Sequence, residues 1–276
     1  ACKSHFTGRT LGFKTQNLRP PFRATYTINQ RTYSQHIQRS LRFEDYLSPA
    51  ELTKYFAKRQ QIKLLSVEGN IGAGKSTLIN ELLNRKESSE FELVKEPSER
   101  WINEHNSETG KNMLQSYYED QKRNAAMFQV YALLTRLIVL VKTTIHTNKK
   151  ILIIERSPES DRHCFFEVNR ALGYINGFDS NVYELFFNIC ESTLNFRPDG
   201  HVFLQLTPKE CATRIKERGL ASEQSIPMDY LQMLEDAHSK WIMNCKNVLV
   251  IDSGRVDLKN NPAGVQEVID KIRKFA

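Results

Sequence analysis

The clearest candidate for chemistry is a short segment between positions 69 and 76. It reads GNIGAGKS, which fits G-x-x-x-x-G-K-[ST], and it follows the apolar run IKLLSV, which is typical of a buried strand. Glycines let the backbone curl until several N–H groups face one anion, and a helix that begins after them turns its positive end to the same place. A lysine and a hydroxyl then serve the outer phosphates and a magnesium ion. The pattern predicts a phosphate-binding loop made of Gly69, Asn70, Ile71, Gly72, Ala73, Gly74, Lys75, Ser76 and Thr77.

The elements that must hold this loop alternate along the chain. After a short lead-in helix, with Ser48 as its N-cap and Pro49 at its first position, apolar strands alternate with helices. The alternation predicts an α/β fold with a parallel five-stranded sheet, helices on both faces and ligand sites at the carboxyl ends of the strands. The predicted strands cover 62–67, 91–95, 150–154, 201–206 and 247–251, and the predicted helices cover 74–86, 112–147, 159–171, 179–193, 208–218, 227–244 and the segment from 262.

Charged residues follow the second and third predicted strands. Glu96 precedes a proline that turns the chain away, so its carboxylate could accept a proton from a hydroxyl that attacks a phosphate. Glu155 could hold magnesium directly or through water, and Arg156 could stabilise charge on a transferred phosphoryl group. The alternatives are an exposed acid at one strand end and a surface salt-bridge cluster at the other.

Two further segments supply candidate binding residues. Arg214 and Arg218 follow the fourth strand, and arginines there suit a helical lid that closes over a phosphate donor; a solvated helix face is the alternative. In the long predicted helix, Phe128 could be ordinary core. Gln129 is less ordinary, because its amide offers a donor and an acceptor side by side, as the edge of a nucleobase requires.

These motifs, in this order, resemble those of the deoxynucleoside kinase family. The resemblance rests on the phosphate loop, EP at 96–97, FQ at 128–129 and ERS at 155–157, and it extends from about residue 61 to the C-terminus. It implies a P-loop kinase that is a homodimer, with ATP and Mg²⁺ as the donor system and a deoxynucleoside as the acceptor. Leu220 departs from the pattern, since relatives often carry a further lid arginine there.

The same resemblance implies a role for each candidate residue. Glu96 would be the base for the 5′-hydroxyl with Arg156 beside it, and Ser76 and Glu155 would lie at the magnesium ion. Arg214 and Arg218 would contact the phosphates of ATP. The nucleoside would be held by Gln129 at the base edge, Phe128 and Phe165 on the base faces, Trp101 in the pocket wall, Tyr118 and Glu223 at the 3′-hydroxyl, and Arg136 with Asp161.

The spacing of three residues bears on which base is preferred. Gln129, Ala132 and Arg136 share one helix face, and Asp161 follows the third strand toward the same pocket. A buried Arg–Asp pair favours a base with an exocyclic amino group and leaves little room for a methyl. We therefore expect deoxyguanosine, deoxyadenosine or deoxycytidine to be preferred over thymidine, although His163 resembles the herpesviral thymidine kinases.

Charge and composition divide the chain into two parts. Residues 1–43 carry eight Lys or Arg and no acid, whereas the remainder holds 31 basic and 32 acidic residues. The basic charge therefore does not indicate nucleic-acid binding by the folded part. An acid-free, Arg-rich arm is typical of a mitochondrial transit segment, with a cytoplasmic location as the alternative. We divide the chain into an arm with the lead-in helix, 1–60, and a kinase domain, 61–276.

The sequence also bears on membranes and on cysteine chemistry. No apolar run approaches the roughly 18 to 20 residues that cross a bilayer, which predicts no membrane partner. The five cysteines are far apart and contain no C-x-x-C pair, so they indicate reduced thiols rather than a zinc site or disulfides.

Three other functions remain compatible with a phosphate loop. A nucleoside monophosphate kinase would need additional arginines for the phosphate of its acceptor. A structural relative in a mitochondrial respiratory complex would be expected to have lost Lys75, Ser76 or Glu96, all of which are present. A regulatory nucleotide-binding module would bind ATP without turnover.

Overall fold

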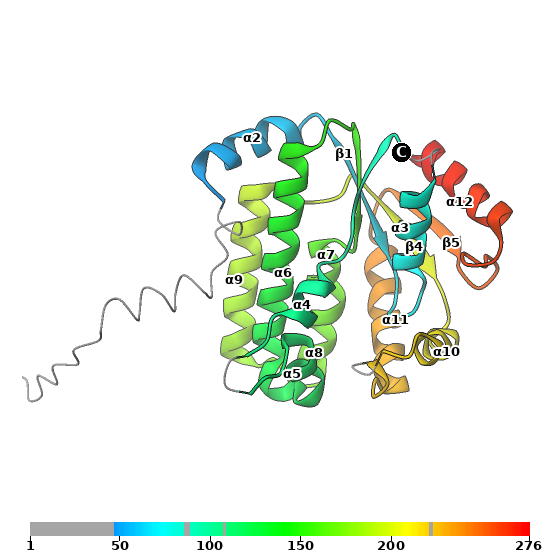
Figure 1. Ribbon diagram of the computed structural model, residues 1–276. Coiled ribbons are helices and arrows are strands. Elements are labelled where there is room, and N and C mark those ends of the chain that lie inside the picture. The colour runs from blue at the N-terminus through cyan, green and yellow to red at the C-terminus, as the bar shows by residue number, and fades with distance from the viewer. Residues whose placement is uncertain (1–46, 86–88, 107–108, 221–222) are drawn as a thin grey trace, which may run out of the picture. The chain divides into compact units, whose positions relative to one another are not determined.

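The computed structural model describes residues 47–85, 89–106, 109–220 and 223–276. These residues form a parallel five-stranded sheet in the order β2-β3-β1-β4-β5 (Figure 1), which confirms the predicted α/β fold. The central strand β1 pairs with β3 on one side and β4 on the other, and Val67 lies opposite Glu155. The strands are β1 Lys63–Glu68, β2 Phe91–Val94, β3 Ile151–Glu155, β4 Gly200–Gln205 and β5 Val248–Asp252.

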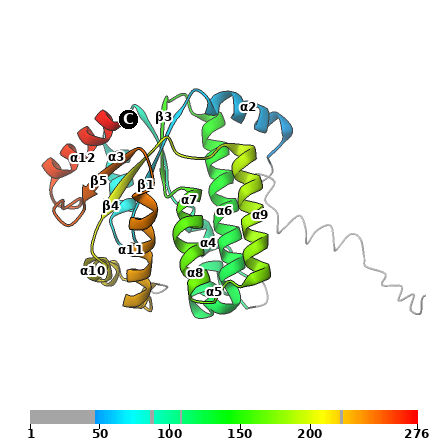
Figure 2. The same cartoon turned by 180° about the vertical axis from the view of Figure 1, so that it is seen from behind.

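Helices cover both faces of the sheet because both faces are apolar. Leu65 and Val67 of β1 point into one buried cluster, and Leu64 points into the other, as the alternation of side chains along a strand requires. Figures 1 and 2 show α6 and α9 together on one side of the sheet, with α3 and α12 on the other. The helices are α2 Pro49–Arg59, α3 Lys75–Asn84, α4 Ser98–Asn103, α5 Met113–Glu119, α6 Gln121–His146, α7 Pro158–Ser160, α8 Glu167–Ala171, α9 Gly177–Leu194, α10 Pro208–Arg218, α11 Met228–Ile242 and α12 Pro262–Phe275.

The long helix predicted over 112–147 is two helices in the structure. The chain leaves helical geometry at Asp120, where φ is −145° and ψ is 79°, and the Asp120 carboxylate accepts a hydrogen bond from the backbone N–H of Arg123. Aspartate is favoured at such a position because it caps the first turn of the next helix. The break separates α5 from α6, and the prediction of one continuous helix is corrected accordingly.

The predicted helix over 159–171 is also irregular. It begins as the short α7, continues as a π-helical turn over Asp161–Phe166, and ends as α8. Wider turns of this kind occur often at functional sites. The turn carries Asp161 and Phe165, two of the predicted substrate contacts. Sequence periodicity also missed α4, which is only six residues long.

The lead-in helix α2 packs against the rest of the described residues. Ser48 and Glu51 form the predicted capping box, with Pro49 at the first helical position. Tyr55 is fully buried, and its hydroxyl donates to the carbonyl of Leu194 at 2.8 Å. The division at residue 60 groups this helix with the arm, whereas in the structure it contacts α6. The predicted targeting arm itself, residues 1–43, lies outside the described residues.

Helix α6 is long and apolar enough, by length and composition, to cross a bilayer. More than half of its most apolar window is buried inside the protein, and Gln129 and Arg136 project from it into the interior. We therefore interpret α6 as the core helix of the domain. The four cysteines among the described residues are free thiols, Cys164, Cys190, Cys211 and Cys245.

Candidate active site

The phosphate-binding loop connects β1 to α3, as the sequence pattern predicts. Gly69 has a φ of +140°, and a Cβ atom there would lie 2.6 Å from the carbonyl oxygen of Leu204. Gly74 precedes the first residue of α3 with a φ of +103°. Both conformations are open to glycine and strained for other residues. The loop therefore needs these two glycines to bring backbone N–H groups and the start of α3 to one place.

Lys75 is buried at the first position of α3. Its ammonium group donates to the carbonyls of Gly69, at 3.0 Å, and Asn70, at 2.6 Å. Burial, together with the charge of Arg156, lowers the pKa of Lys75 to about 7. An anionic phosphate nearby would raise this pKa and stabilise the ammonium form. Lys75 is thus placed to exchange carbonyl contacts for phosphate contacts.

The side chain of Asn70 braces the loop from inside. Its amide oxygen accepts from the backbone N–H of Ile71 at 2.8 Å, and its amide nitrogen donates to the carbonyl of Leu231 at 2.8 Å. The backbone N–H of Ile71 therefore has a partner within the protein. Asn70 is fully buried, so this contact fixes the loop against α11.

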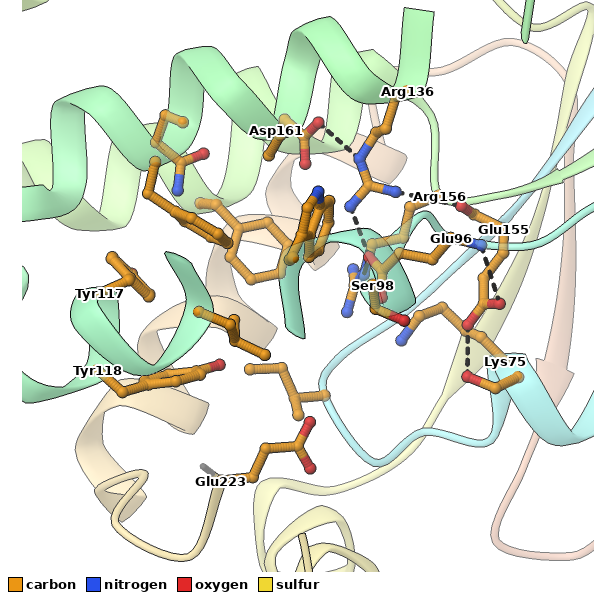
Figure 3. A pocket seen from close by; sticks show the side chains of 18 of the residues that line it. Lys75, Glu96, Ser98, Tyr117, Tyr118, Arg136, Glu155, Arg156, Asp161 and Glu223 are labelled. Atoms are coloured by element: carbon orange, nitrogen blue, oxygen red, sulfur yellow. Dashed lines mark hydrogen bonds and ion pairs between the residues drawn. The ribbon is translucent and has the colours of Figure 1, made fainter. Parts of the chain in front are cut away.

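Five charged residues from four different segments meet beside the loop (Figure 3). The Arg136 guanidinium donates to Asp161 at 2.7 Å and to Glu96 at 2.5 Å. It also donates to the carbonyl of Glu155 at 3.3 Å. Arg156 lies 3.5 Å from Glu96. The sheet explains the meeting, because β2 and β3 end at the same edge and α6 passes over it.

Burial and charge act in opposite directions on these carboxylates. Burial tends to raise the pKa of Glu96, but Arg136 and Arg156 together outweigh it and hold this pKa below its ordinary value of 4.5. For Asp161 burial dominates and raises the pKa to about 6, although Arg136 opposes the rise. Both groups are ionised at neutral pH. Glu96 is therefore in the form that can accept a proton.

This lowered pKa predicts the acid limb of the pH–rate profile. A base with a depressed pKa stays ionised until the pH falls below the ordinary value, so we expect the limb of kcat/KM that reports Glu96 to lie below about pH 4.5, separate from the steps that Asp161 near pH 6 and Lys75 near pH 7 would add. Arg136→Met removes the positive charge that does most to lower the pKa of Glu96, so burial should raise this pKa and the acid limb should move to higher pH. Rate profiles of both proteins, with circular dichroism to verify folding at each pH, test this expectation. An acid limb at the same pH in both proteins contradicts it.

Ser76 and Glu155 form the oxygen pair predicted for a metal ion. The Ser76 hydroxyl donates to one carboxylate oxygen of Glu155 at 2.5 Å, and the other oxygen accepts from the backbone N–H of Glu96 at 3.4 Å. The described residues hold no cluster of three or more His, Cys, Asp or Glu that could form a metal cage. One hydroxyl and one carboxylate suit Mg²⁺, which usually combines one or two carboxylates with waters and substrate phosphates.

A cavity opens beside this cluster, and its empty space, including the open solvent at its mouth, is about 730 Å³. All three predicted catalytic residues and all eight predicted nucleoside contacts line this cavity. Sequence reasoning did not assign Ser98, Leu114, Tyr117 or Tyr230 to it. The predicted residues in its wall are Glu96, Glu155, Arg156, Trp101, Tyr118, Phe128, Gln129, Arg136, Asp161, Phe165 and Glu223.

Aromatic rings form much of the cavity wall. Phe128 stacks on Tyr117 with ring centroids 4.5 Å apart and meets the edge of Trp101 at 5.5 Å. Phe165 lies under the guanidinium of Arg156, 4.7 Å from its ring centroid. Figure 3 shows Tyr118 and Glu223 facing the same space. These rings offer flat apolar surfaces to a planar ligand.

Gln129 is the polar residue of this wall whose bonding is incomplete. It is 1% exposed, and its amide oxygen has no hydrogen-bond partner among the described residues. A buried polar atom without a partner is unfavourable, by about 1 to 3 kcal/mol. A ligand that donates a hydrogen bond to this oxygen would remove that penalty.

A second cavity lies on the other side of the loop, and its empty space, including the open solvent at its mouth, is about 1430 Å³. Gly74 and Thr77 line it, and so does the loop from Gly254 to Asn260, which sequence reasoning missed. Gly69, Asn70 and Ala73 line neither cavity. The two cavities share four wall residues, Gly72, Lys75, Ser76 and Arg218.

The two predicted lid arginines differ in their contacts. Arg214 donates to the carbonyls of Ala73, at 3.3 Å, and Ser253, at 2.7 Å, so it connects the phosphate loop to the loop after β5. Arg218 forms an ion pair with Glu223. Arg214 therefore lines the second cavity, whereas Arg218 lies between the two cavities.

A phosphate-binding loop after the central strand, with two cavities that meet at Lys75, defines a phosphotransferase of the P-loop kinase class. The comparison with known families identifies it further, because the model of the deoxynucleoside kinase family matches residues 65–276. The chain belongs to the deoxynucleoside kinase family, as the sequence motifs predicted.

Individual relatives agree with this assignment. The chain is 32% identical to deoxycytidine kinase 2 of Gallus gallus over 256 residues, which cover 82% of this chain and 94% of that protein. It is 34% identical to deoxycytidine kinase of Mus musculus over 201 residues, 67% of this chain and 76% of that protein. It is 29% identical to mitochondrial deoxyguanosine kinase of Xenopus laevis over 243 residues, which cover 79% of this chain and 91% of that protein.

Proposed function

We propose that this enzyme transfers a phosphoryl group from ATP to the 5′-hydroxyl of a deoxyribonucleoside. The observation that carries the proposal is the meeting of the two cavities at Lys75 and Ser76, with Glu96 in the wall of the smaller one. ATP would occupy the larger cavity and the nucleoside the smaller. The transferred group would then lie against Lys75, within reach of both substrates.

The residues around that point have complementary roles in the proposed reaction. Glu96 accepts the proton of the 5′-hydroxyl while the hydroxyl oxygen attacks the γ-phosphorus of ATP, and the bond from that phosphorus to ADP breaks, so that ADP leaves. Arg156 and Lys75 stabilise the charge on the equatorial oxygens of the phosphoryl group. Tyr118 and Glu223 bind the 3′-hydroxyl and thereby orient the sugar. Ser76 and Glu155 would hold Mg²⁺, which neutralises charge on the donor phosphates when it is bound.

The arginines of the smaller cavity favour a nucleoside over a nucleoside monophosphate as acceptor. Arg136 bonds to Asp161 and Glu96, Arg156 pairs with Glu96, and Arg218 pairs with Glu223. The guanidinium groups lining this cavity thus have carboxylate partners already. An acceptor that brought its own phosphate would need a further cation, because the proposed reaction already uses Arg156 and Arg218 at the phosphates of the donor and Arg136 is held between Asp161 and Glu96.

The base-binding end of the cavity favours an amino-bearing base. The Gln129 oxygen can accept from an exocyclic amino group, and the Arg136–Asp161 pair adds a charged donor and acceptor. We propose deoxycytidine, deoxyguanosine or deoxyadenosine as preferred acceptors over thymidine. The names of the relatives, deoxycytidine and deoxyguanosine kinases, support the same preference.

A phosphotransfer assay tests the proposed function directly. The purified protein is incubated with ATP, Mg²⁺ and each of the four deoxynucleosides in turn, and with deoxycytidine monophosphate as a separate acceptor. We expect monophosphate products from the amino-bearing nucleosides. Turnover of the monophosphate alone would identify a nucleoside monophosphate kinase, and ATP binding without any turnover would identify a regulatory module.

An apolar stripe on α9 supports the proposal of a homodimer. Phe178, Val182, Leu185 and Ile189 are between 49% and 80% exposed, and their spacing of four, three and four residues places them on one helix face. On α6, which contacts α9, Met127 is 64% exposed as well. A heptad-like stripe of this kind suits packing against the same stripe of a second copy.

Substitution within the stripe should therefore separate the subunits. In Leu185→Lys a two-fold interface loses two buried leucines, worth about 3 kcal/mol together or about 100-fold in dissociation constant. We expect a dimer for the unmodified protein and a monomer for the variant, measured by size-exclusion chromatography with light scattering. Met243→Lys replaces an apolar residue that is even more exposed, at 79% against 63% for Leu185, and that lies just after α11; this variant should remain dimeric. A dimeric Leu185→Lys protein would exclude this surface.

We further propose that the enzyme is imported into mitochondria through its basic arm. The acid-free composition of residues 1–43 supports this, and one relative is named as a mitochondrial deoxyguanosine kinase. Deletion of residues 1–43 should abolish import into isolated mitochondria while kcat and Tm change little. A deletion protein that fails to fold would make the arm structural, and continued import would place the signal elsewhere.

A further inference from the structure

His238 on α11 contacts the catalytic Arg156 although it lines neither cavity. The histidine is fully buried, and its Nε2 atom lies 3.2 Å from the Nη1 atom of Arg156. Its Nδ1 atom lies 2.7 Å from the carbonyl oxygen of Leu234. A carbonyl only accepts hydrogen bonds, so Nδ1 carries the proton. Nε2 of the neutral ring is then the acceptor, and the Arg156 guanidinium donates to it.

The charge state of His238 is consistent with this arrangement. Burial, with the positive charge of Arg156 in addition, holds the pKa of His238 well below its ordinary value. A protonated ring would present a second donor and a second positive charge to the guanidinium. The rings of Phe165 and Phe203 also contact the imidazole and restrict its rotation. The ring is therefore a fixed acceptor that does not change its charge at neutral pH.

The backbone and the side chain of Arg156 are held by separate contacts. Its φ is +60°, a conformation that is uncommon for a residue with a side chain. The backbone N–H of Arg156 donates to the carbonyl of Val67 at 3.0 Å, which fixes the main chain at the edge of the sheet. The side chain is held separately, between Glu96, the ring of Phe165 and His238.

Helix α11 gives His238 a stable position relative to the phosphate loop. Asn70 of the loop donates to the Leu231 carbonyl, two helical turns before His238. The same helix therefore contacts the loop that would bind the donor and the arginine that would act on the transferred group. We infer that His238 is a positioning residue, which orients the Arg156 guanidinium toward the transferred phosphoryl group through a neutral imidazole acceptor.

This inference rests on the proposed phosphotransferase function, and its test separates the two. His238→Phe keeps a ring of similar shape but removes the acceptor, whereas His238→Gln can place an amide oxygen near the position of Nε2. Misplacement of a reacting group by about 1 Å can reduce the rate about 100-fold. We expect kcat to fall about 10- to 100-fold in His238→Phe, with the KM of the nucleoside nearly unchanged, and to stay within about threefold in His238→Gln.

A buried histidine outside the site serves as the matched control. His201 is 6% exposed and bonds to the Ser66 hydroxyl, and His201→Phe should change Tm but not kcat. Equal losses of kcat in His238→Phe and His238→Gln would overturn the inference, as would an unchanged kcat in His238→Phe. A protein without activity before substitution would instead contradict the proposed function.

A double-mutant cycle covers the case in which His238→Phe does not fold. His238→Met and Arg156→Lys are then made singly and together, and kcat is compared among the four proteins. If His238 acts through Arg156, its substitution should have little further effect once Arg156 is replaced. Independent, multiplicative losses would overturn the inference.

Discussion

Replacement of Glu96 by glutamine should retain nucleoside binding and remove most turnover. The amide has nearly the shape of the carboxylate but does not accept the proton of the 5′-hydroxyl. General base catalysis is worth about 100- to 10,000-fold, so the loss should appear in kcat and leave the Kd of the nucleoside within a few-fold. Steady-state kinetics and nucleoside titrations of the variant measure the two effects separately.

Glu96 has a structural role besides its proposed role as the base, and the control for Glu96→Gln must account for it. Glu96 also bonds to Arg136 and Arg156, so Glu96→Gln removes a charge from a buried cluster. Glu99→Gln is the matched change, because Glu99 is an exposed acid three residues further along that lines neither cavity. It should leave kcat unchanged. A Glu96→Gln enzyme with nearly normal kcat would exclude Glu96 as the base.

Replacement of both members of the Arg136–Asp161 pair should shift the base preference toward thymidine. Arg136→Met and Asp161→Ala together remove a buried ion pair and make room for a methyl group. A methyl-sized clash is worth about 1 to 3 kcal/mol, or about 10- to 200-fold in kcat/KM. The measured quantity is the ratio of kcat/KM for thymidine to kcat/KM for deoxycytidine.

A ratio is the appropriate measure because Arg136 has a second contact. Its guanidinium also donates to Glu96, so its loss should lower kcat for every nucleoside. Asp161→Ala alone leaves the contact with Glu96 in place and isolates the effect at the base. If the unmodified protein already prefers thymidine over the three amino-bearing nucleosides, the proposed reading of this pocket is wrong.

Sequence reasoning reached the fold because its signals were local. The apolar strands and the glycine-rich loop each carry their pattern within about ten residues, and all five strands are in the structure. The break at Asp120 was missed because residues on both sides of it favour helix. Helix α4 was missed because a single six-residue helix shows too little periodicity.

The site was accessible to sequence reasoning only in part, for a similar reason. Residues at strand ends, such as Glu96 and Glu155, can be found because the topology of a parallel sheet brings strand ends together. Tyr117 and Tyr230 reach the cavity wall from α5 and α11, and nothing in the local pattern distinguishes them from core residues. His238 offered a signal, because a histidine within an apolar helical face is unusual.

If ATP and a nucleoside occupy the two cavities as proposed, the ion pair between Arg218 and Glu223 makes the binding of the two substrates interdependent. Arg218 lies in the wall of both cavities, whereas Glu223 belongs to the smaller one. A donor phosphate that draws Arg218 away leaves Glu223 free to accept a hydrogen bond from the sugar, and a sugar that engages Glu223 releases Arg218 for the donor. Coupling between two sites is reciprocal, so each substrate must change the affinity for the other by the same factor.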